Sequence, residues 1–457
     1  MARSASHDKR LVAVFDAIRV CEQRTVPVID WTRFYGEEVG VSAPSYVGPV
    51  AIHEFEGRGL GLIATCKISP GEVVLIEDSF GLSSTPNGPI QKAKTELVEA
   101  CCNKLGSVDT PLLYKATFWC LHSEDEETRW EGWKQTSFRK SVLHKYFDHL
   151  NSAESANGTY NGLEQPPPDW GKSKKSVASV VSLNSRKTER WNPWTLLLDE
   201  SKSLGGLWLA ASLFNHSCLG NIVVSYGAGK DHSTLVARAA APIEKGEELL
   251  HTYVYPFDTF RERQSKLQSI YGFYCHCCRC TIEAPHASLA SRLADDLELE
   301  LQKFSAARGG AKSKMVEVVK GMGSALASIE KAEESLPADL RKVWRSQFLW
   351  GDHGLAMAAQ EAGLFPEAVH AFRTCASLVA LAAPSSEYEL KYSMMLAQCM
   401  ARWTLSTPQV SPRPDLKEAL REAEEAHNRL YGGGGRHFVV RMKKRLEEIY
   451  AALRRLQ

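Results

Sequence analysis

The sequence lacks the features of a membrane or secreted protein. No run of about eighteen uninterrupted apolar residues occurs in its 457 residues, so we expect no membrane-spanning helix. The N-terminal MARSASHDKR lacks the apolar segment of a secretory signal, so we expect the cysteines to stay reduced. Neither charge dominates, with 55 Lys and Arg against 54 Asp and Glu. That balance argues against a protein held to nucleic acid mainly by phosphate contacts.

The length and the local patterns predict an α+β protein of two or three domains. An apolar periodic pattern at residues 11–23 predicts a helix within an N-terminal segment, residues 1–46. Short runs rich in Val and Ile at residues 47–55 and 71–78, separated by Gly-rich or Pro-Gly turns, predict strands.

The rest of the chain changes pattern three times. Residues 91–150 look helical and end in a Trp-rich polar helix, whereas residues 151–176 are rich in Asn, Gly, Pro and Ser and predict a mobile surface loop. Strand patterns return at residues 221–227, 233–239 and 248–253. After about residue 284 the pattern is helical to the end of the sequence.

One C-terminal segment has the pattern of a repeat. GLFPEAVHAFRTCASL places Gly363, Ala368, Phe372 and Cys375 at the small and large packing positions of a helix–turn–helix unit, and it resembles a tetratricopeptide repeat. Ordinary packing of amphipathic helices accounts for the same pattern, and both alternatives stay open. Either one predicts a helical bundle or a short solenoid.

Two polar clusters indicate a metal site. Cys275, Cys277 and Cys280 lie within six residues, and three thiolates so close together suit one ion, which is usually zinc in a reduced compartment. Cys218, in the cluster SLFNHSCLGN, is the expected fourth ligand. We expect Cys278 to point away, since adjacent side chains usually diverge. Four thiolates leave no open position, so the site would be structural; ordinary buried cysteines are the alternative.

Four motifs occur in a fixed order: EGRGLGLIATCKISPGEVVLIED, SLFNHSCLGN, EKGEELLHTY and RERQSKLQSIYGFYCHCCRC. Together they resemble the signatures of a SET-domain protein lysine methyltransferase and its Cys-rich post-SET segment. The resemblance covers residues 48–82 and 177–284. A split SET domain followed by a helical C-terminal domain is similar to the SMYD type and to plant-type proteins that join tetratricopeptide repeats to SET domains.

This resemblance implies a division of the chain. Residues 47–284 would form a SET β-fold of short strands, with a helical insertion at about 83–176 and a zinc-binding post-SET segment at 271–284. Residues 285–457 would form the tetratricopeptide-like domain. After the first strands only Cys101, Cys102 and Cys120 are available, too few for the two zinc sites of a MYND finger, so we predict that none is present.

The resemblance also implies S-adenosylmethionine as the methyl donor. Arg58 would contact its carboxylate, and Gly59-Leu60-Gly61 would allow close approach of the backbone, since Gly has no Cβ. A solvated surface position is the alternative for Arg58.

Four further positions match cofactor contacts of the family. Asn215 and His216 would hold the amino and adenine ends, and Phe273 would stack on the adenine. Asn184 resembles a further contact, although Arg186 stands where the family usually has an aromatic residue. Core packing is the alternative for His216 and Phe273.

Tyr253 matches the catalytic tyrosine of the family, and Tyr271 a second tyrosine of the lysine channel. Methyl transfer needs a neutral amine, and the pKa of free lysine is about 10.4, so neutrality at pH 7 costs roughly 4–5 kcal/mol. An aromatic channel beside a cationic cofactor lowers that pKa, and a tyrosine hydroxyl aligns the amine lone pair. A tyrosine that merely ends a strand is the alternative for Tyr253.

The predicted function is therefore methylation of a lysine ε-amine in a histone or another protein, by a monomer in the nucleus, the cytoplasm or both. The alternative is an inactive SET-like scaffold that binds partner proteins through its helical domain. Plant SET enzymes that methylate chloroplast proteins are a third possibility, but they lack this Cys-rich segment. We expect no direct contact with nucleic acid and none with a membrane.

Overall fold

The computed structural model describes most of the chain. The described residues are 26–35, 43–84, 90–121, 135–152, 174–188, 191–192, 197–198, 204–227, 234–407 and 415–456. The predicted helix at residues 11–23 lies outside them, as do residues 153–173 of the predicted loop and the tryptophans of the predicted polar helix. Residues 174–176 of that loop instead begin helix α7 (Lys174–Asn184). None of the described helices is both long and apolar enough to cross a bilayer.

The chain forms two compact units. The first unit comprises Met1–Asn192, Leu197–Asn215 and Asn221–Leu250, and the second comprises Pro193–Leu196, His216–Gly220 and His251–Gln457. The chain passes between the units inside two short strands, β10 (Asn215–His216) and β13 (Leu250–His251). The post-SET segment thus belongs to the same unit as the C-terminal helices.

The first unit is built on short antiparallel strands. Its largest sheet has the order β1-β4-β12-β11 and consists of β1 (Tyr46–Val47), β4 (Val73–Asp78), β12 (Thr234–Ala239) and β11 (Ile222–Tyr226). Ile76 on β4 lies opposite both Tyr46 and Val236. All six residues of β12 are buried, which identifies it as a central strand covered on both faces.

The glycine-rich segment expected as a turn is itself a strand. β2 (Val50–Phe55) pairs along its whole length with β3 (Gly59–Ala64), so the turn is confined to the three residues between them. Gly57 and Gly59 both have positive φ values, 71° and 73°, which a side chain would disfavour. The prediction was wrong here: the glycines of this segment favour a turn, but the apolar residues between and after Gly59 and Gly61 are mostly buried and the segment pairs with β2.

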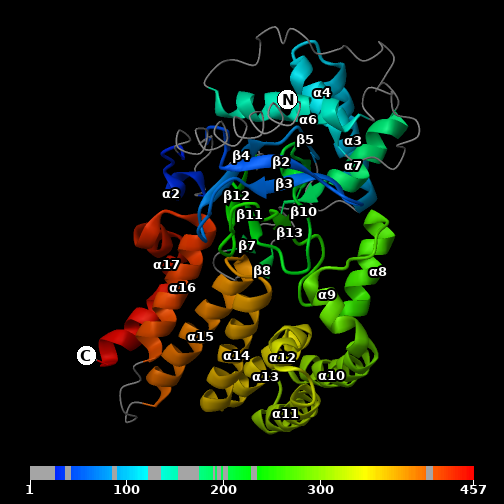
Figure 1. Cartoon of the computed structure of the whole chain (residues 1–457). Helices are drawn as coiled ribbons and strands as arrows, with labels where there is room; N and C mark the ends of the chain where they lie inside the picture. The colour runs from blue at the N-terminus through cyan, green and yellow to red at the C-terminus, as the bar shows by residue number, and fades with distance from the viewer. Residues whose placement is uncertain are drawn as a thin grey trace, which may run out of the picture. The chain divides into compact units, whose positions relative to one another are not determined.

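Two smaller sheets and five helices complete the described part of the first unit. The strands are β5 (Gly81–Leu82), β9 (Gly205–Leu207) and β6 (Arg186–Lys187) in one sheet, and β7 (Trp191–Asn192) with β8 (Leu197–Leu198) in the other. The helices are α2 (Trp31–Phe34), α3 (Ile90–Gly106), α4 (Leu112–Cys120), α6 (Thr136–Asn151) and α7. Helices α3, α4, α6 and α7 gather on one side of the strands (Figure 1). Cys101 and Cys120 are buried in this core.

The second unit is helical, as the pattern after residue 284 predicts. Its helices are α8 (Phe260–Tyr271), α9 (Cys278–Glu283), α10 (Ala287–Ala307), α11 (Lys312–Glu334), α12 (Ala338–Arg345), α13 (Leu349–Ala362), α14 (Phe365–Ala382), α15 (Glu387–Ser406), α16 (Asp415–Tyr431) and α17 (Gly434–Leu456), with short 3₁₀ turns at Ala284–His286 and Ser346–Phe348. From α13 onward, successive helices lie side by side (Figure 1). Gly363, with φ 80°, ends α13, and Ala368, Phe372 and Cys375 are buried. The α+β class is therefore confirmed.

Candidate active site and metal centre

In the first unit, strand β3 carries the glycine pair of the predicted cofactor site. A Cβ added at Gly61 would lie 2.5 Å from Nδ2 of Asn215 and 2.9 Å from the Phe55 ring. Both distances are shorter than a real Cβ contact, so glycine is what lets the Asn215 amide rest against the strand. The structure thus brings together two predicted cofactor residues that lie more than 150 positions apart in the sequence.

The carboxylate of Glu248, which was not nominated from the sequence, holds Asn215 and Arg58 in position. Glu248 accepts a hydrogen bond from Nδ2 of Asn215 at 2.9 Å and forms an ion pair with Nη2 of Arg58 at 2.7 Å. The Arg58 guanidinium also lies 4.8 Å from the centre of the Phe55 ring. Glu248 stands in the quoted motif GEELLHTY, but sequence alone does not show which of its two acidic residues turns inward.

Asn221 continues the same framework. Its Nδ2 donates to the carbonyl oxygen of Glu248 at 2.8 Å, and its Oδ1 accepts from the Leu250 N–H at 2.7 Å. The side chain therefore ties the NHSC segment to the backbone that leads toward Tyr253.

Asn184 and Arg186 flank the 3₁₀ turn Ala211–Leu213, just before the NHSC segment. The Asn184 carbonyl accepts from Oγ of Ser212 at 3.4 Å, and Nη2 of Arg186 donates to the Ala211 carbonyl at 2.8 Å. The Asn184 side chain donates to Val180 O of its own helix at 2.7 Å. Its amide nitrogen is thus used within the fold, and the cofactor contact of Asn184 stays a prediction.

A buried carboxylate supports this 3₁₀ turn from below. Glu77 on β4 is fully buried and accepts the N–H groups of Ala210 and Ala211 at 2.8 and 3.0 Å, as well as the Tyr146 hydroxyl at 2.9 Å. Burial raises the pKa of Glu77 to about 7, although these hydrogen bonds act in the opposite direction. Its partners are dipoles and not cations, so the desolvation cost of the charge is only partly offset.

In the second unit, His216 links the predicted catalytic tyrosine to a predicted metal ligand. Its Nδ1 accepts the Tyr253 backbone N–H at 3.0 Å, which places the ring proton on Nε2, and Nε2 lies 3.4 Å from Sγ of Cys218. Both ring nitrogens are therefore engaged inside the protein. The role of His216 toward the cofactor stays a prediction.

The predicted aromatic residues of this unit form one group. The ring centres of Tyr253 and Tyr271 are 4.9 Å apart, and Phe273 lies 6.4 Å from Tyr271 and 6.0 Å from His216. Gly272 ends α8 with φ 76° and turns the chain between the second tyrosine and the phenylalanine. The structure thus gathers the three aromatic rings and the histidine that the sequence nominated.

Four cysteines converge beside this group. The sulfur atoms of Cys218, Cys275, Cys277 and Cys280 all lie within 4.8 Å of one another, the first and last at 3.5 Å. Sulfur atoms at the corners of a zinc tetrahedron, about 2.3 Å from the metal, are spaced by ~3.8 Å, so the donor set fits zinc. Cys278 is exposed and stands outside this cluster, as expected.

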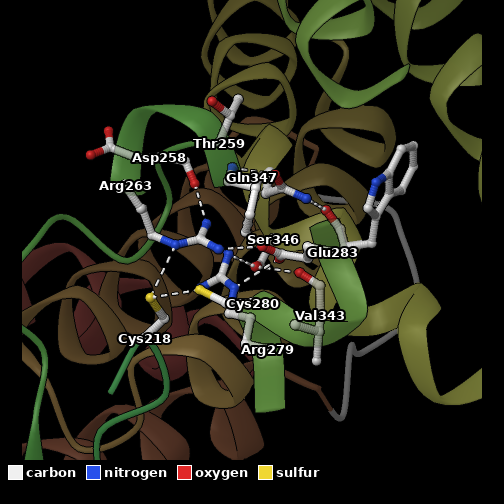
Figure 2. Close-up of polar contacts among 12 residues, drawn as sticks. Cys218, Asp258, Thr259, Arg263, Arg279, Cys280, Glu283, Val343, Ser346 and Gln347 are labelled. Atoms are coloured by element: carbon white, nitrogen blue, oxygen red, sulfur yellow. Dashed lines mark hydrogen bonds and ion pairs between the residues drawn. The ribbon is translucent and has the colours of Figure 1, made fainter. Parts of the chain in front are cut away.

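Helix α8 holds two of the ligand segments in place. A capping box between Thr259 and Glu262 begins the helix. From its first turns, Gln264 donates to the Cys275 carbonyl at 2.7 Å and accepts the Cys275 N–H at 2.9 Å. Nε of Arg263 donates to Sγ of Cys218 at 3.3 Å (Figure 2). Neither residue was nominated from the sequence.

The thiol cluster favours ionisation of some of its sulfur atoms and opposes that of others. Hydrogen bonds from Cys275, Cys277 and Cys280 hold the pKa of Cys218 far below its usual value, against the effect of burial. Hydrogen bonds with Cys218, Cys275 and Cys277, together with burial, raise the pKa of Cys280. Full ionisation of all four sulfur atoms therefore calls for a cation among them, which is the chemistry of a thiolate metal site.

Comparisons with known proteins give the family of the central region. Residues 59–254 match the family described as "SET domain". Over 88 residues the chain is 38% identical to "Histone-lysine N-methyltransferase set5" of Schizosaccharomyces pombe, which is 19% of this chain and 26% of that protein. Over 99 residues it is 34% identical to "Histone-lysine N-methyltransferase SMYD3" of Mus musculus, 21% of this chain and 22% of that protein.

Two longer matches are more distant. A "Methyltransferase" of Gibberella zeae is 24% identical over 291 residues, 60% of this chain and 36% of that protein. The solved "Structure of Rubisco LSMT bound to Sinefungin and Monomethyllysine" aligns with 79% of this chain and 88% of that chain, at 12% identity and a TM-score of 0.23, too low to bear on the arrangement of this chain. The chain spans roughly a quarter to a third of the length of the three curated relatives.

Proposed function

Because the chain contains a SET domain, we propose that it is an S-adenosylmethionine-dependent protein lysine N-methyltransferase. The observation that carries the proposal is the grouping of Tyr253, Tyr271 and Phe273 around His216, whose ring accepts the backbone N–H of Tyr253. A scaffold without activity has no physical need to fix the backbone of a tyrosine in this way.

The nominated residues would contribute different parts of the chemistry. Asn215, the glycine pair of β3 and Arg58 are proposed contacts of the methyl donor, as are Asn184, the main chain of His216 and the ring of Phe273. Tyr253 and Tyr271 would line the lysine channel. Glu248 would hold Arg58 and Asn215 in position.

The proposed reaction is an in-line displacement at a methyl carbon. S-adenosylmethionine would supply the methyl group on a sulfonium sulfur, which leaves as a thioether. The lysine amine must first lose its proton to solvent, and the aromatic rings favour the neutral amine by excluding water. The Tyr253 hydroxyl would orient the lone pair of the amine toward the methyl carbon, which is the larger part of the catalysis.

We further propose that Cys218, Cys275, Cys277 and Cys280 hold one Zn²⁺. The closed set of four sulfur ligands leaves no position for substrate, so the metal would stabilise the fold and not take part in the transfer. The metal would also help to position Tyr253. The segment that carries the ligand Cys218 also carries His216, whose ring accepts the backbone N–H of Tyr253.

The substrate would be a histone or another protein. Two of the relatives are named histone-lysine N-methyltransferases, which supports this proposal. We propose a monomer that acts in the nucleus, the cytoplasm or both and that contacts neither nucleic acid nor membrane directly. The helical repeats of the second unit, which we interpret as tetratricopeptide-like, would bind protein. In the alternative function, partner binding by these helices would be the whole activity.

The test is transfer of a labelled methyl group from S-adenosylmethionine into core histones and, separately, into a whole-cell extract. The wild type should label a protein band, and Tyr253→Phe should not. Tyr274→Phe is the control for loss of a tyrosine hydroxyl, because Tyr274 follows Phe273 in the sequence but is 62% exposed, and it should keep its activity. Cofactor binding without label in either pool would favour the scaffold, and no cofactor binding would mean that the resemblance to SET-domain methyltransferases is one of fold only.

A further inference from the structure

Three buried charges lie directly beside the cysteine cluster. Figure 2 shows Arg263 on α8 and Arg279 and Glu283 on α9 near Cys218 and Cys280. Each of the three charged side chains is at most 1% exposed. Arginine and glutamate are almost never fully buried unless they are paired. None of the three was nominated from the sequence, so their burial is a finding of the structure alone.

Arg263 is the member of this group that contacts a sulfur. Its Nε donates to Sγ of Cys218 at 3.3 Å, its Nη1 donates to the Asp258 carbonyl at 2.6 Å, and its Nη2 pairs with Oε2 of Glu283. All three nitrogens are thus used, in three directions. A guanidinium provides this rigid fork of donors, whereas a lysine ammonium does not.

Arg279 extends the group to the C-terminal helices. Its Nε pairs with Oε1 of Glu283 at 2.8 Å, its Nη1 donates to the Pro256 carbonyl at 2.6 Å, and its Nη2 donates to Oγ of Ser346 at 3.0 Å. Ser346 begins the 3₁₀ turn between α12 and α13. Glu283 therefore joins a residue that touches the thiol cluster to a residue that touches this turn.

The charges of this group do not cancel by themselves. Two guanidinium groups and one carboxylate leave one net positive charge, and an unpaired charge in the interior is strongly unfavourable. Four thiolates around a divalent ion carry two negative charges. The cluster beside Arg263 is the natural counter-charge, and the hydrogen bond from Nε is the point where the two charge systems meet.

We propose that Arg263 is a positioning residue of the metal centre: its hydrogen bond to the Cys218 thiolate and its positive charge increase retention of the metal and reduce the reactivity of that sulfur. Glu283 and Arg279 hold the guanidinium in place and make metal retention depend on the packing of the turn at Ser346. This inference rests on the proposed zinc site.

The test compares Arg263→Met with Arg261→Met in the full-length protein. Arg261 is on the same helix but exposed, and its Nη2 donates to Ser288, so the same substitution there controls for loss of an arginine. Zinc content is measured first in the wild type. Zinc affinity is then measured by competition with a chromophoric chelator, and the metal release caused by N-ethylmaleimide is timed.

Arg263→Met should bind zinc about 10- to 100-fold more weakly than Arg261→Met, as is typical when an outer partner of a ligand is lost. It should also release the metal faster on alkylation. In the Co²⁺-substituted protein, the sulfur-to-metal charge-transfer band should move to longer wavelength, because the thiolate loses a hydrogen bond. A purely structural arginine would lower the melting temperature and leave the band and the affinity unchanged.

An affinity within twofold of the control, with an unshifted band, would overturn the role of Arg263 while leaving the metal site intact. Absence of zinc from the wild type would instead overturn the metal site, and the inference with it. If Arg263→Met does not fold, Arg263→Lys against Arg261→Lys serves, because it keeps the charge but loses the fork. An intermediate loss of affinity is then expected, and equal affinities would reject the inference.

Discussion

Glu77 and Glu283 are both buried carboxylates, yet the two units satisfy them in opposite ways. Glu77 accepts hydrogen bonds from two backbone N–H groups and a tyrosine hydroxyl, all of them neutral. Glu283 lies between the guanidinium groups of Arg263 and Arg279. The neutral dipoles around Glu77 offset only part of the desolvation cost of its charge. The two cations around Glu283 leave that group with a net positive charge, which requires a further negative charge nearby. The first unit should therefore respond to protons and the second to metal.

The largest effect, on zinc affinity and on methyl transfer, is expected when the Cys218 thiolate of the second unit is removed. Cys218→Ser removes a proposed zinc ligand and the acceptor of Arg263, so zinc affinity should fall by more than the ~10- to 100-fold typical of an outer partner. Methyl transfer should fall with it, because His216 links the same segment to the Tyr253 backbone. Zinc content and transfer rate measure both losses. Cys278→Ser, at an exposed cysteine, should change neither; loss of zinc with full transfer would disprove the link.

Removing the carboxylate between the two arginines should have the next largest effect. Glu283→Ala leaves two buried guanidinium groups without their shared partner, which should cost about 3–5 kcal/mol in the free energy of unfolding. Denaturant titration at fixed zinc concentration measures it. Glu425→Ala, which breaks an exposed pair with Arg421, should cost less than about 1 kcal/mol. Equal costs would mean that burial of the Glu283 network adds nothing.

The buried carboxylate of Glu77 in the first unit should make the free energy of unfolding depend on pH. Burial raises the pKa of Glu77 to about 7, and an unfolded glutamate titrates near 4.3, so between these values the folded state binds the proton more tightly. Its contribution to stability is complete below pH about 4.3 and is lost as the pH rises to about 7, by on the order of 2–4 kcal/mol. Glu77→Gln should flatten this part of the curve of unfolding free energy against pH. An unchanged slope would assign the dependence to other groups.

The smallest effect on stability is expected at the third carboxylate, Glu248, whose arginine partner is half exposed. Arg58→Ala should change the free energy of unfolding by less than about 1 kcal/mol, because exposed ion pairs contribute little. Calorimetric titration with S-adenosylmethionine should nevertheless show weaker binding if Arg58 contacts the carboxylate of the donor. Unchanged affinity would reject that role and leave Arg58 as a surface residue.

Much of this protein follows from its sequence alone. The order of the four motifs indicates the SET domain, and the spacing of Cys275, Cys277 and Cys280 with Cys218 indicates the thiol cluster, because metal ligands must recur at short, chemically restricted intervals. The helical C-terminal part is equally visible, since the 3.6-residue period is a local property. One local prediction was wrong. The glycines of β3 favour a turn, but the segment is a strand because its apolar residues are mostly buried.

Only the tertiary structure decided which polar side chains turn inward. Glu77, Glu248, Arg263, Arg279 and Glu283 stand in segments where charged residues usually face water, and nothing in their spacing separates them from solvated neighbours. Arg263 and Cys218 are 45 positions apart, and Glu77 and Ala210 are 133 apart. Burial and charge balance at such distances depend on how whole elements pack. The sequence therefore determined what kind of site the chain carries, and the fold determined which charges hold it together.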